Sequence, residues 1–197
     1  MTYEAKDFSR LLGIPGFSDE LLQNHFKLYE GYVTNTNTLI EKIIKLHRGD
    51  NMGSPEFAEL KRRFGWEFNG MRLHELYFEN LNKDATGPDP ELPIIKALTE
   101  QFDSFETFEN YFRATASMRG IGWIVLYYDP QNKIFLAPWI NEHDVGHPVG
   151  CVPLLVMDVF EHAFLTDYGL KRTDYIEAFM KAVDWDVVLK RFEAAQK

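Results

Sequence analysis

A stripe of apolar residues at helical spacing constrains the fold of this chain more than any other feature. It runs from Ser18 to His47 and consists of Leu22, Phe26, Tyr29, Val33, Thr36, Ile40, Ile43 and Leu46. Residues three or four apart share one face of a helix, so the spacing predicts one long helix with a single buried side. Ser18 can cap its N-terminus, where Asp19 and Glu20 complement the helix dipole.

Helical patterns continue beyond this stripe and are interrupted once by a segment rich in proline. Shorter helices are predicted at 55–64 and 67–82. Residues 82–93 then hold three prolines and one glycine among polar residues, which is typical of a linker. Further helices are predicted at 94–102, 104–118, 173–182 and 184–195, with Ser104 as a cap.

The periodicity changes in the second half of the chain. Residues 123–128 and 134–140 are rich in β-branched and aromatic residues and flank the turn sequence DPQNK, which predicts a hairpin. A third strand is predicted at 152–157. We therefore expect an α+β fold: an N-terminal helical hairpin domain over residues 1–85, the linker 82–93, and a C-terminal domain over residues 94–197 with a three-stranded antiparallel sheet and helices.

Composition excludes several classes of protein. The single cysteine, Cys151, excludes an internal disulfide framework and a thiolate-rich metal site. A net charge of −9 argues against nucleic acid as a partner, because phosphate binding requires clustered Lys and Arg. No apolar run approaches the ~18 residues that a membrane span needs. We expect a cytoplasmic protein with neither nucleic acid nor membrane as a partner.

The sequence MDVFEHAF, residues 157–164, places Asp158 and His162 four residues apart in an apolar stretch. Burying both side chains is costly unless they share a compensating partner, which is either a metal ion or a simple Asp–His hydrogen bond. His25 and His74 also lie among apolar neighbours. One such histidine alone is usually a core residue, but three imidazoles with one carboxylate suit iron, manganese or zinc.

Four segments of the chain resemble the iron/manganese superoxide dismutase family. The segment 157–179 is similar to its signature D-x-W-E-H-A, with Phe160 in place of the usual tryptophan. The matching segments are GIGWIVL at 120–126 for the first hairpin strand, LHELYFENL at 73–81 for the second ligand helix, and NHFKLYEGYVTNTN at 24–37 for the first. The resemblance implies four metal ligands: His25, His74, Asp158 and His162.

The resemblance also implies an activity. A mononuclear iron or manganese centre would cycle between two redox states and convert two superoxide anions into dioxygen and hydrogen peroxide. We expect one iron ion per subunit, while manganese, or use of either metal, remains open. A homodimer or homotetramer is implied as well. Two alternatives stay open: a metal-dependent hydrolase and a non-catalytic metal-binding homologue.

Two further residues match positions that act on the reaction in this family. Tyr32 matches the gateway tyrosine, which lines the substrate funnel and relays protons. The side chain that contacts the metal-bound solvent comes either from the position of Gly70, which has none here, or from the loop after the hairpin. The match in that loop selects His143, and Glu142, one residue away, remains an alternative.

The residues around the site follow the family less closely. Glu161 matches a glutamate that bonds the last histidine ligand of the partner subunit, and Arg172 matches a basic residue near the funnel. Aromatic residues that would wall the site are Trp123, Tyr77 and Phe160. The chain is one residue shorter than usual between His25 and Tyr32, and the gate histidines are replaced by Tyr29 and Glu30, with Leu165 in place of a tyrosine. How the gate works without those histidines is left open.

One histidine pair has no counterpart in this assignment. His143 and His147 have the i, i+4 spacing of a helical metal site, but Gly146 and Pro148 disfavour the helix that such a site would need.

Overall fold

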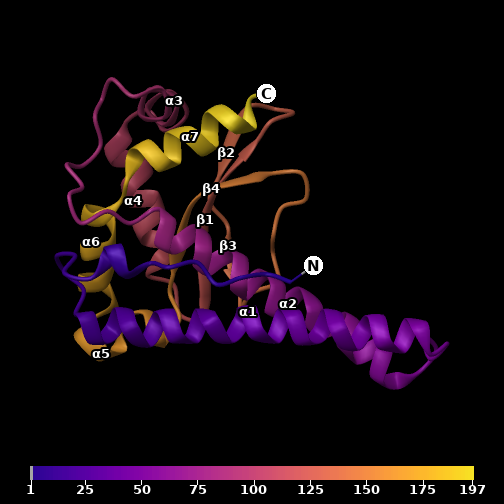
Figure 1. Ribbon diagram of the computed structural model, residues 1–197. Coiled ribbons are helices and arrows are strands. Elements are labelled where there is room, and N and C mark those ends of the chain that lie inside the picture. The colour runs from indigo at the N-terminus through magenta and orange to yellow at the C-terminus, as the bar shows by residue number, and fades with distance from the viewer. Residues whose placement is uncertain (1) are drawn as a thin grey trace.

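A computed structural model describes residues 2–197, and a long helical hairpin follows the N-terminal segment (Figure 1). Helices α1 (Asp19–Arg48) and α2 (Pro55–Glu79) form this hairpin. Ser18 caps α1 by accepting a hydrogen bond from the Leu21 N–H, as the sequence predicts. α2 is continuous, whereas the sequence predicted two shorter helices. Packing along α1 supplies stability that local propensity lacks near Gly65.

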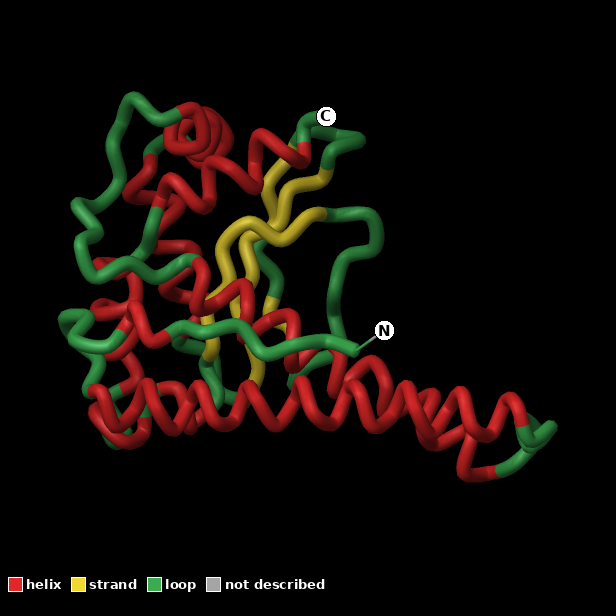
Figure 2. Tube along the Cα trace, viewed as in Figure 1, coloured by secondary structure: helices red, strands yellow, loops and turns green. Residues whose placement is uncertain are grey.

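Only the inner parts of the two long helices reach the core. The last buried residue of α1 is Leu39, and the first of α2 is Glu67. Figure 2 shows the outer ends extending past the rest of the molecule as a pair of helices joined by a short loop. The inner parts therefore carry the contacts that bring α1 and α2 to the sheet.

The sheet is antiparallel and is organised around the buried strand β1 (Gly122–Asp129). β4 (Val152–Asp158) pairs with β1, as do β2 (Ile134–Leu136) and β3 (Trp139–Asn141), which bond to its two ends. The predicted strand 134–140 is thus split near Pro138, because proline has no N–H for the ladder. The α+β class is confirmed, with four strands instead of three.

The remaining helices pack on the sheet or on neighbouring helices. They are α3 (Pro93–Phe102), α4 (Phe105–Ala116), α5 (Leu165–Tyr168), α6 (Arg172–Ala182) and α7 (Trp185–Ala195), with short 3₁₀ turns η1 (Ser9–Leu11) and η2 (Glu161–Ala163). Ser104 caps α4, as predicted. α4 packs on β1, and α2 and α7 pack on β4. Within residues 2–197, no helix combines the length and apolar character that crossing a bilayer requires.

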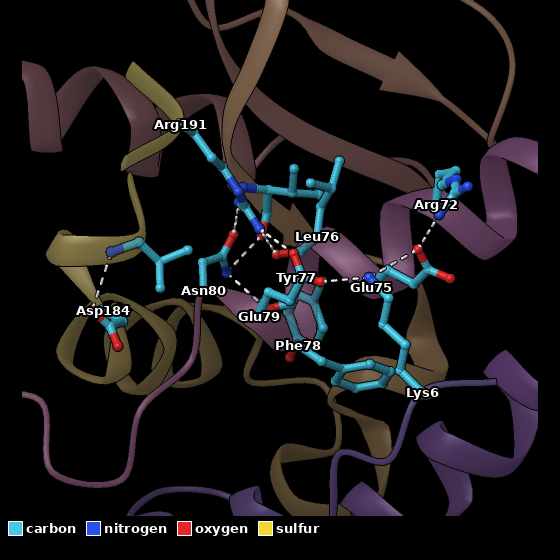
Figure 3. Close-up of polar contacts among 12 residues, drawn as sticks. Lys6, Arg72, Glu75, Leu76, Tyr77, Phe78, Glu79, Asn80, Asp184 and Arg191 are labelled. Atoms are coloured by element: carbon cyan, nitrogen blue, oxygen red, sulfur yellow. Dashed lines mark hydrogen bonds and ion pairs between the residues drawn. The ribbon is translucent and has the colours of Figure 1, made fainter. Parts of the chain in front are cut away.

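A polar junction joins α2, β4 and α7 (Figure 3). The Asn80 side chain, fully buried, donates to the Val156 carbonyl and accepts from the Val156 N–H at 3.0 Å. Arg191 on α7 donates to the carbonyls of Leu154 and Leu76 at 2.8 and 3.1 Å and to Glu79 at 3.0 Å. The C-terminal end of α2 is therefore fixed against the strand that ends at Asp158.

Candidate metal centre

Four side chains from four elements converge beside the end of β4. His25 lies on α1, His74 on α2, Asp158 at the last position of β4 and His162 in η2. Their ligating atoms all lie within 4.8 Å of one another. Three of the four residues are buried, and the His162 side chain is 28% exposed. The structure thus brings together the four residues that the sequence singled out.

The spacing of the four side chains fits a shared metal ion. Asp158 Oδ2 lies 3.2, 3.7 and 3.0 Å from the Nε2 atoms of His25, His74 and His162. Ligands bound at about 2.1 Å are separated by about 3.0 Å at right angles and about 3.6 Å at about 120°. The observed separations therefore match neighbouring ligands of one ion.

The protonation of the histidines also fits a metal. His74 Nδ1 donates to the Gly70 carbonyl at 2.6 Å, which leaves a lone pair on Nε2. That Nε2 is buried and has no hydrogen-bond partner among the described residues. Burial lowers the pKa of His25 and lowers that of His74 strongly, so both stay neutral, the form that binds metals.

Asp158 contributes the negative charge of the cluster. Burial by itself would raise the pKa of this carboxyl, but the imidazoles of His162 and His25 outweigh burial and hold the pKa well below its usual range. Because His25 and His74 are neutral, they give this buried carboxylate no full countercharge, which a cation would supply. The donor set, three imidazole nitrogens with one hard oxygen, suits iron or manganese.

A chain of tyrosines supports Asp158 from behind. Its Oδ1 accepts the Phe160 N–H at 2.8 Å, and its carbonyl accepts the Tyr175 hydroxyl at 2.6 Å. Because the Tyr175 hydrogen is used in that bond, the Tyr77 hydroxyl, 3.2 Å away, donates to Tyr175. The Phe160 N–H thus orients the carboxylate independently of the histidines, and the two tyrosines hold the backbone of Asp158.

A second polar group, Tyr32 with His143, lies beside the cluster. The Tyr32 Oη and His143 Nε2 atoms are 2.7 Å apart, and the Tyr32 ring stacks on His74 with centroids 5.1 Å apart. The Trp123 Nε1–H donates to His143 Nδ1 at 3.0 Å. Burial lowers the pKa of His143 to about 4, so the ring is neutral near pH 7.

The tautomer of His143 follows from its tryptophan partner. An indole N–H can only donate, so Nδ1 of the neutral ring is the acceptor and Nε2 carries the hydrogen. His143 therefore donates to the Tyr32 oxygen, and the phenol hydrogen of Tyr32 stays available to another acceptor. Burial raises the pKa of Tyr32 to about 12, which keeps that hydrogen on the phenol at neutral pH.

Aromatic rings enclose both groups. Phe160 stacks on His143 with centroids 4.7 Å apart, and Trp66 meets the same ring edge-on at 4.8 Å. Trp123 meets His74 edge-on at 5.0 Å, and the Tyr77 ring lies 5.2 Å from His25. Water is thereby excluded from most of the site.

Three predicted residues lie outside the buried cluster. The Arg172 guanidinium donates to the carbonyls of Met118 and Gly120 at 2.6 and 2.8 Å and to the Val159 carbonyl at 3.2 Å. It thus joins α6 to the segment that precedes β1 and to the residue that follows β4. Glu161 is exposed and comes directly before His162. Glu142 has a positive φ of 52° and its side chain is half-buried, whereas His143 is buried.

The match of Tyr29 to a gate histidine was a prediction from the resemblance only, and in the structure Tyr29 belongs to a different network. Its hydroxyl donates to Glu75 at 3.1 Å and accepts the Lys6 N–H at 3.0 Å. Glu75 is buried and also binds Arg72 and the Lys6 ammonium, as Figure 3 shows. Tyr29 therefore ties α1 to the N-terminal segment and to the residue that follows His74.

Sequence reasoning missed Tyr175 and Trp66 as neighbours of the site. Their signals are weak, since each is an aromatic residue at ordinary helical spacing. Only the tertiary contacts distinguish them from other core residues.

The fold and this cluster define a class of protein: an α+β metalloprotein with a buried site of three histidines and one aspartate. Residues 90–191 match the family model for the C-terminal domain of iron/manganese superoxide dismutases. The chain belongs to the iron/manganese superoxide dismutase family.

Relatives of this chain extend over nearly its full length. The chain is 35% identical to a superoxide dismutase [Fe] of Aquifex pyrophilus, over 98% of this chain and 92% of that protein. It is 32% identical to a superoxide dismutase [Fe] of Saccharolobus solfataricus, over 91% and 87% of the two chains. It is also 32% identical to superoxide dismutase [Mn] 2 of Haloferax volcanii, over 92% and 89%.

Proposed function

We propose that this protein is a superoxide dismutase with one iron or manganese ion per subunit, held by His25, His74, Asp158 and His162. The observation that carries the proposal is the buried Asp158 carboxylate within 3.7 Å of the Nε2 atoms of three imidazoles. Full-length relatives named as iron or manganese superoxide dismutases support it. An ion bound there supplies a one-electron couple, by which two superoxide anions and two protons become dioxygen and hydrogen peroxide.

The protein contributes charge, enclosure and a proton to this reaction. The Asp158 carboxylate offsets part of the positive charge of the ion. Trp123, Phe160 and Tyr77 limit water at the site. Tyr32 is the proton donor in this proposal, because its phenol hydrogen is not used by His143, which donates to the Tyr32 oxygen instead.

The choice of metal is a finer proposal, and we propose iron. Gly70 has no side chain to reach the site, so in this proposal His143 supplies the polar contact beside the metal. Hydrogen bonds around a metal set its redox potential. Relatives of similar identity carry either iron or manganese in their names. Manganese and use of either metal are the competing outcomes.

Assembly and location are proposed from the same relationship. We propose a homodimer or homotetramer in which the exposed Glu161 bonds the His162 of a second copy. We propose a cytoplasmic location and neither nucleic acid nor membrane as a partner, in line with the net charge of −9. The division into residues 1–85 and 94–197 is likewise proposed, with the site formed between the two parts.

A metal-dependent hydrolase is a weaker candidate. It would need a general base close to the ion. His143, which lies beside the cluster, accepts a hydrogen bond from Trp123 on Nδ1 and donates from Nε2. Neither nitrogen is then free to take a proton from water.

The experiment that tests the proposal is stopped-flow decay of superoxide on one preparation, split and reconstituted separately with iron and manganese. Fast decay in one form establishes the enzyme and its metal, and fast decay in both establishes that either metal works. Decay at the uncatalysed rate in both forms, with metal bound, would refute the proposal.

Two histidines on α1 provide a matched pair of variants. His25→Ala should lose metal and activity together, whereas His47→Ala, at an exposed position of the same helix, should keep both. Tyr32→Phe should keep the metal and slow turnover by about a hundredfold or more, the scale of a lost proton donor. A Tyr32→Phe protein without metal would show that Tyr32 is misplaced in this proposal.

A further inference from the structure

The histidine pair at 143 and 147 lies in the loop between β3 and β4. Asn141 and Val145 exchange two backbone hydrogen bonds, which close a tight turn with His143 in it. Gly146 follows with a positive φ of 105°, and a Cβ there would lie 3.1 Å from the Trp139 carbonyl oxygen. The chain therefore reverses sharply after His143, which brings the His147 ring back toward the turn.

His147 contacts the backbone of His143 and not its ring. The His147 Nε2 lies 2.9 Å from the His143 carbonyl oxygen. A carbonyl can only accept, so Nε2 carries the hydrogen and donates. The other nitrogen, Nδ1, lies 2.6 Å from the Tyr127 hydroxyl, which donates to it. Both ring nitrogens are thus engaged, and neither is free to bind a metal.

Strand β1 holds His143 at two points. Trp123 and Tyr127 are four residues apart on β1, so their side chains point to the same face of the sheet. Trp123 bonds directly to the His143 ring, and Tyr127 holds its carbonyl through His147. Tyr127 is buried, which makes it a fixed anchor for a loop that is otherwise partly exposed.

We propose that His147, anchored by Tyr127, is a positioning residue that fixes the loop of His143 and so sets the contact between His143 and Tyr32. This inference rests on the proposed dismutase function, because it assigns His147 an effect on turnover through those two residues. His147 itself touches neither the four-residue cluster nor Tyr32 among the contacts that the structure gives.

The test compares glutamine and asparagine at position 147. The amide nitrogen of Gln reaches as far as Nε2 of histidine and can donate to the His143 carbonyl. The amide nitrogen of Asn stops near the position of Nδ1 and cannot. With metal content matched, we expect His147→Gln to keep most of the rate of superoxide decay and His147→Asn to lose about tenfold, the lower end for residues that orient a metal site from outside.

A second measurement separates positioning from general stability. In a His143→Ala background, replacing His147 should cause no further loss of rate, because the residue through which it acts is absent. A merely structural role would lower the unfolding temperature without this dependence on His143. Tyr127→Phe should also reduce the rate, but by less than His147→Asn. In part of the molecules the His147 ring would still carry its hydrogen on Nε2 and donate it to the His143 carbonyl.

Equal rates in the Gln and Asn variants, or the same fractional loss with and without His143, would overturn the proposal. These outcomes differ from a failure of the proposed function, in which the wild-type protein with metal bound would itself show no catalysed decay.

Discussion

Replacing Gly70 with alanine should break the contact between Tyr32 and His143. A Cβ at position 70 would lie 2.5 Å from Cδ1 of the Tyr32 ring. Carbon atoms in contact are about 3.5 to 4.0 Å apart, so the ring must move by about 1 Å. The Tyr32 Oη to His143 Nε2 distance is 2.7 Å, and a movement of that size takes it past the normal hydrogen-bond range.

Gly31 provides the matched control for this variant. It is exposed within α1, and a Cβ there would meet nothing within 4 Å. Both substitutions gain about 1 kcal/mol of helix propensity. The difference in unfolding free energy between the two variants therefore isolates the cost of the collision at residue 70, which is about 1–3 kcal/mol for an overpacked site. At about 2–4 °C per kcal/mol for a domain of this size, Gly70→Ala should unfold several degrees below Gly31→Ala.

The assay is thermal unfolding together with superoxide decay at equal metal content. Gly31→Ala should unfold at or above the wild-type temperature and keep its activity. Gly70→Ala should unfold at a lower temperature and lose activity. In a Tyr32→Ala background the ring is gone, so Gly70→Ala should no longer lower the unfolding temperature. Equal unfolding temperatures for Gly31→Ala and Gly70→Ala, with activity unchanged in both, would refute this reasoning.

Two further predictions concern charge near the site. Burial lowers the pKa of His143 to about 4, while the unfolded chain titrates near 6.5. The unfolded state therefore takes up a proton first, and the stability that this residue contributes is present above about pH 6.5 and lost toward pH 4. Between about pH 6.5 and pH 4, the free energy of unfolding measured with urea should fall by up to about 3 kcal/mol more in the wild type than in His143→Gln. Parallel curves of this free energy against pH would contradict the prediction. Arg63 lies over the Trp66 ring at 4.7 Å with its side chain 53% exposed, on a chain of net charge −9. Arg63→Gln should slow superoxide decay several-fold at low salt and little at high salt. Arg62→Gln removes the same charge and should not slow the decay. Equal effects of the two variants would exclude electrostatic steering of superoxide by Arg63.

The parts of the fold that could be predicted from sequence are those set by local pattern. The apolar stripe predicts α1, Ser18 predicts its start, and the change from helical to alternating spacing predicts the change from helices to a sheet. Asp158 and His162 stood out because a charged pair in an apolar run needs a partner. Each of these signals lies within one short segment.

The parts that could not be predicted depend on contacts between distant segments. α2 continues through Gly65 because α1 packs along it, and no local signal indicates that. The strand predicted at 134–140 divides because its pairing with β1 is interrupted near Pro138. The role of Tyr175 depends on a bond to the Asp158 carbonyl, and that of His147 on a bond to Tyr127. Such partners are visible only after the chain has folded.

The junction of Asn80 with Arg191 has a consequence for the order in which the molecule is made. Synthesis produces α1 and α2 first, and N-terminal segments begin to fold before the rest has been made. His25 and His74 are then present while Asp158 and its strand are still missing. α2 can bond β4 through Asn80 only after β4 has been made, and Arg191 on α7 then joins both through the carbonyls of Leu76 and Leu154. Closure of the metal site is therefore a late step in folding, and the ion is captured by a nearly finished protein.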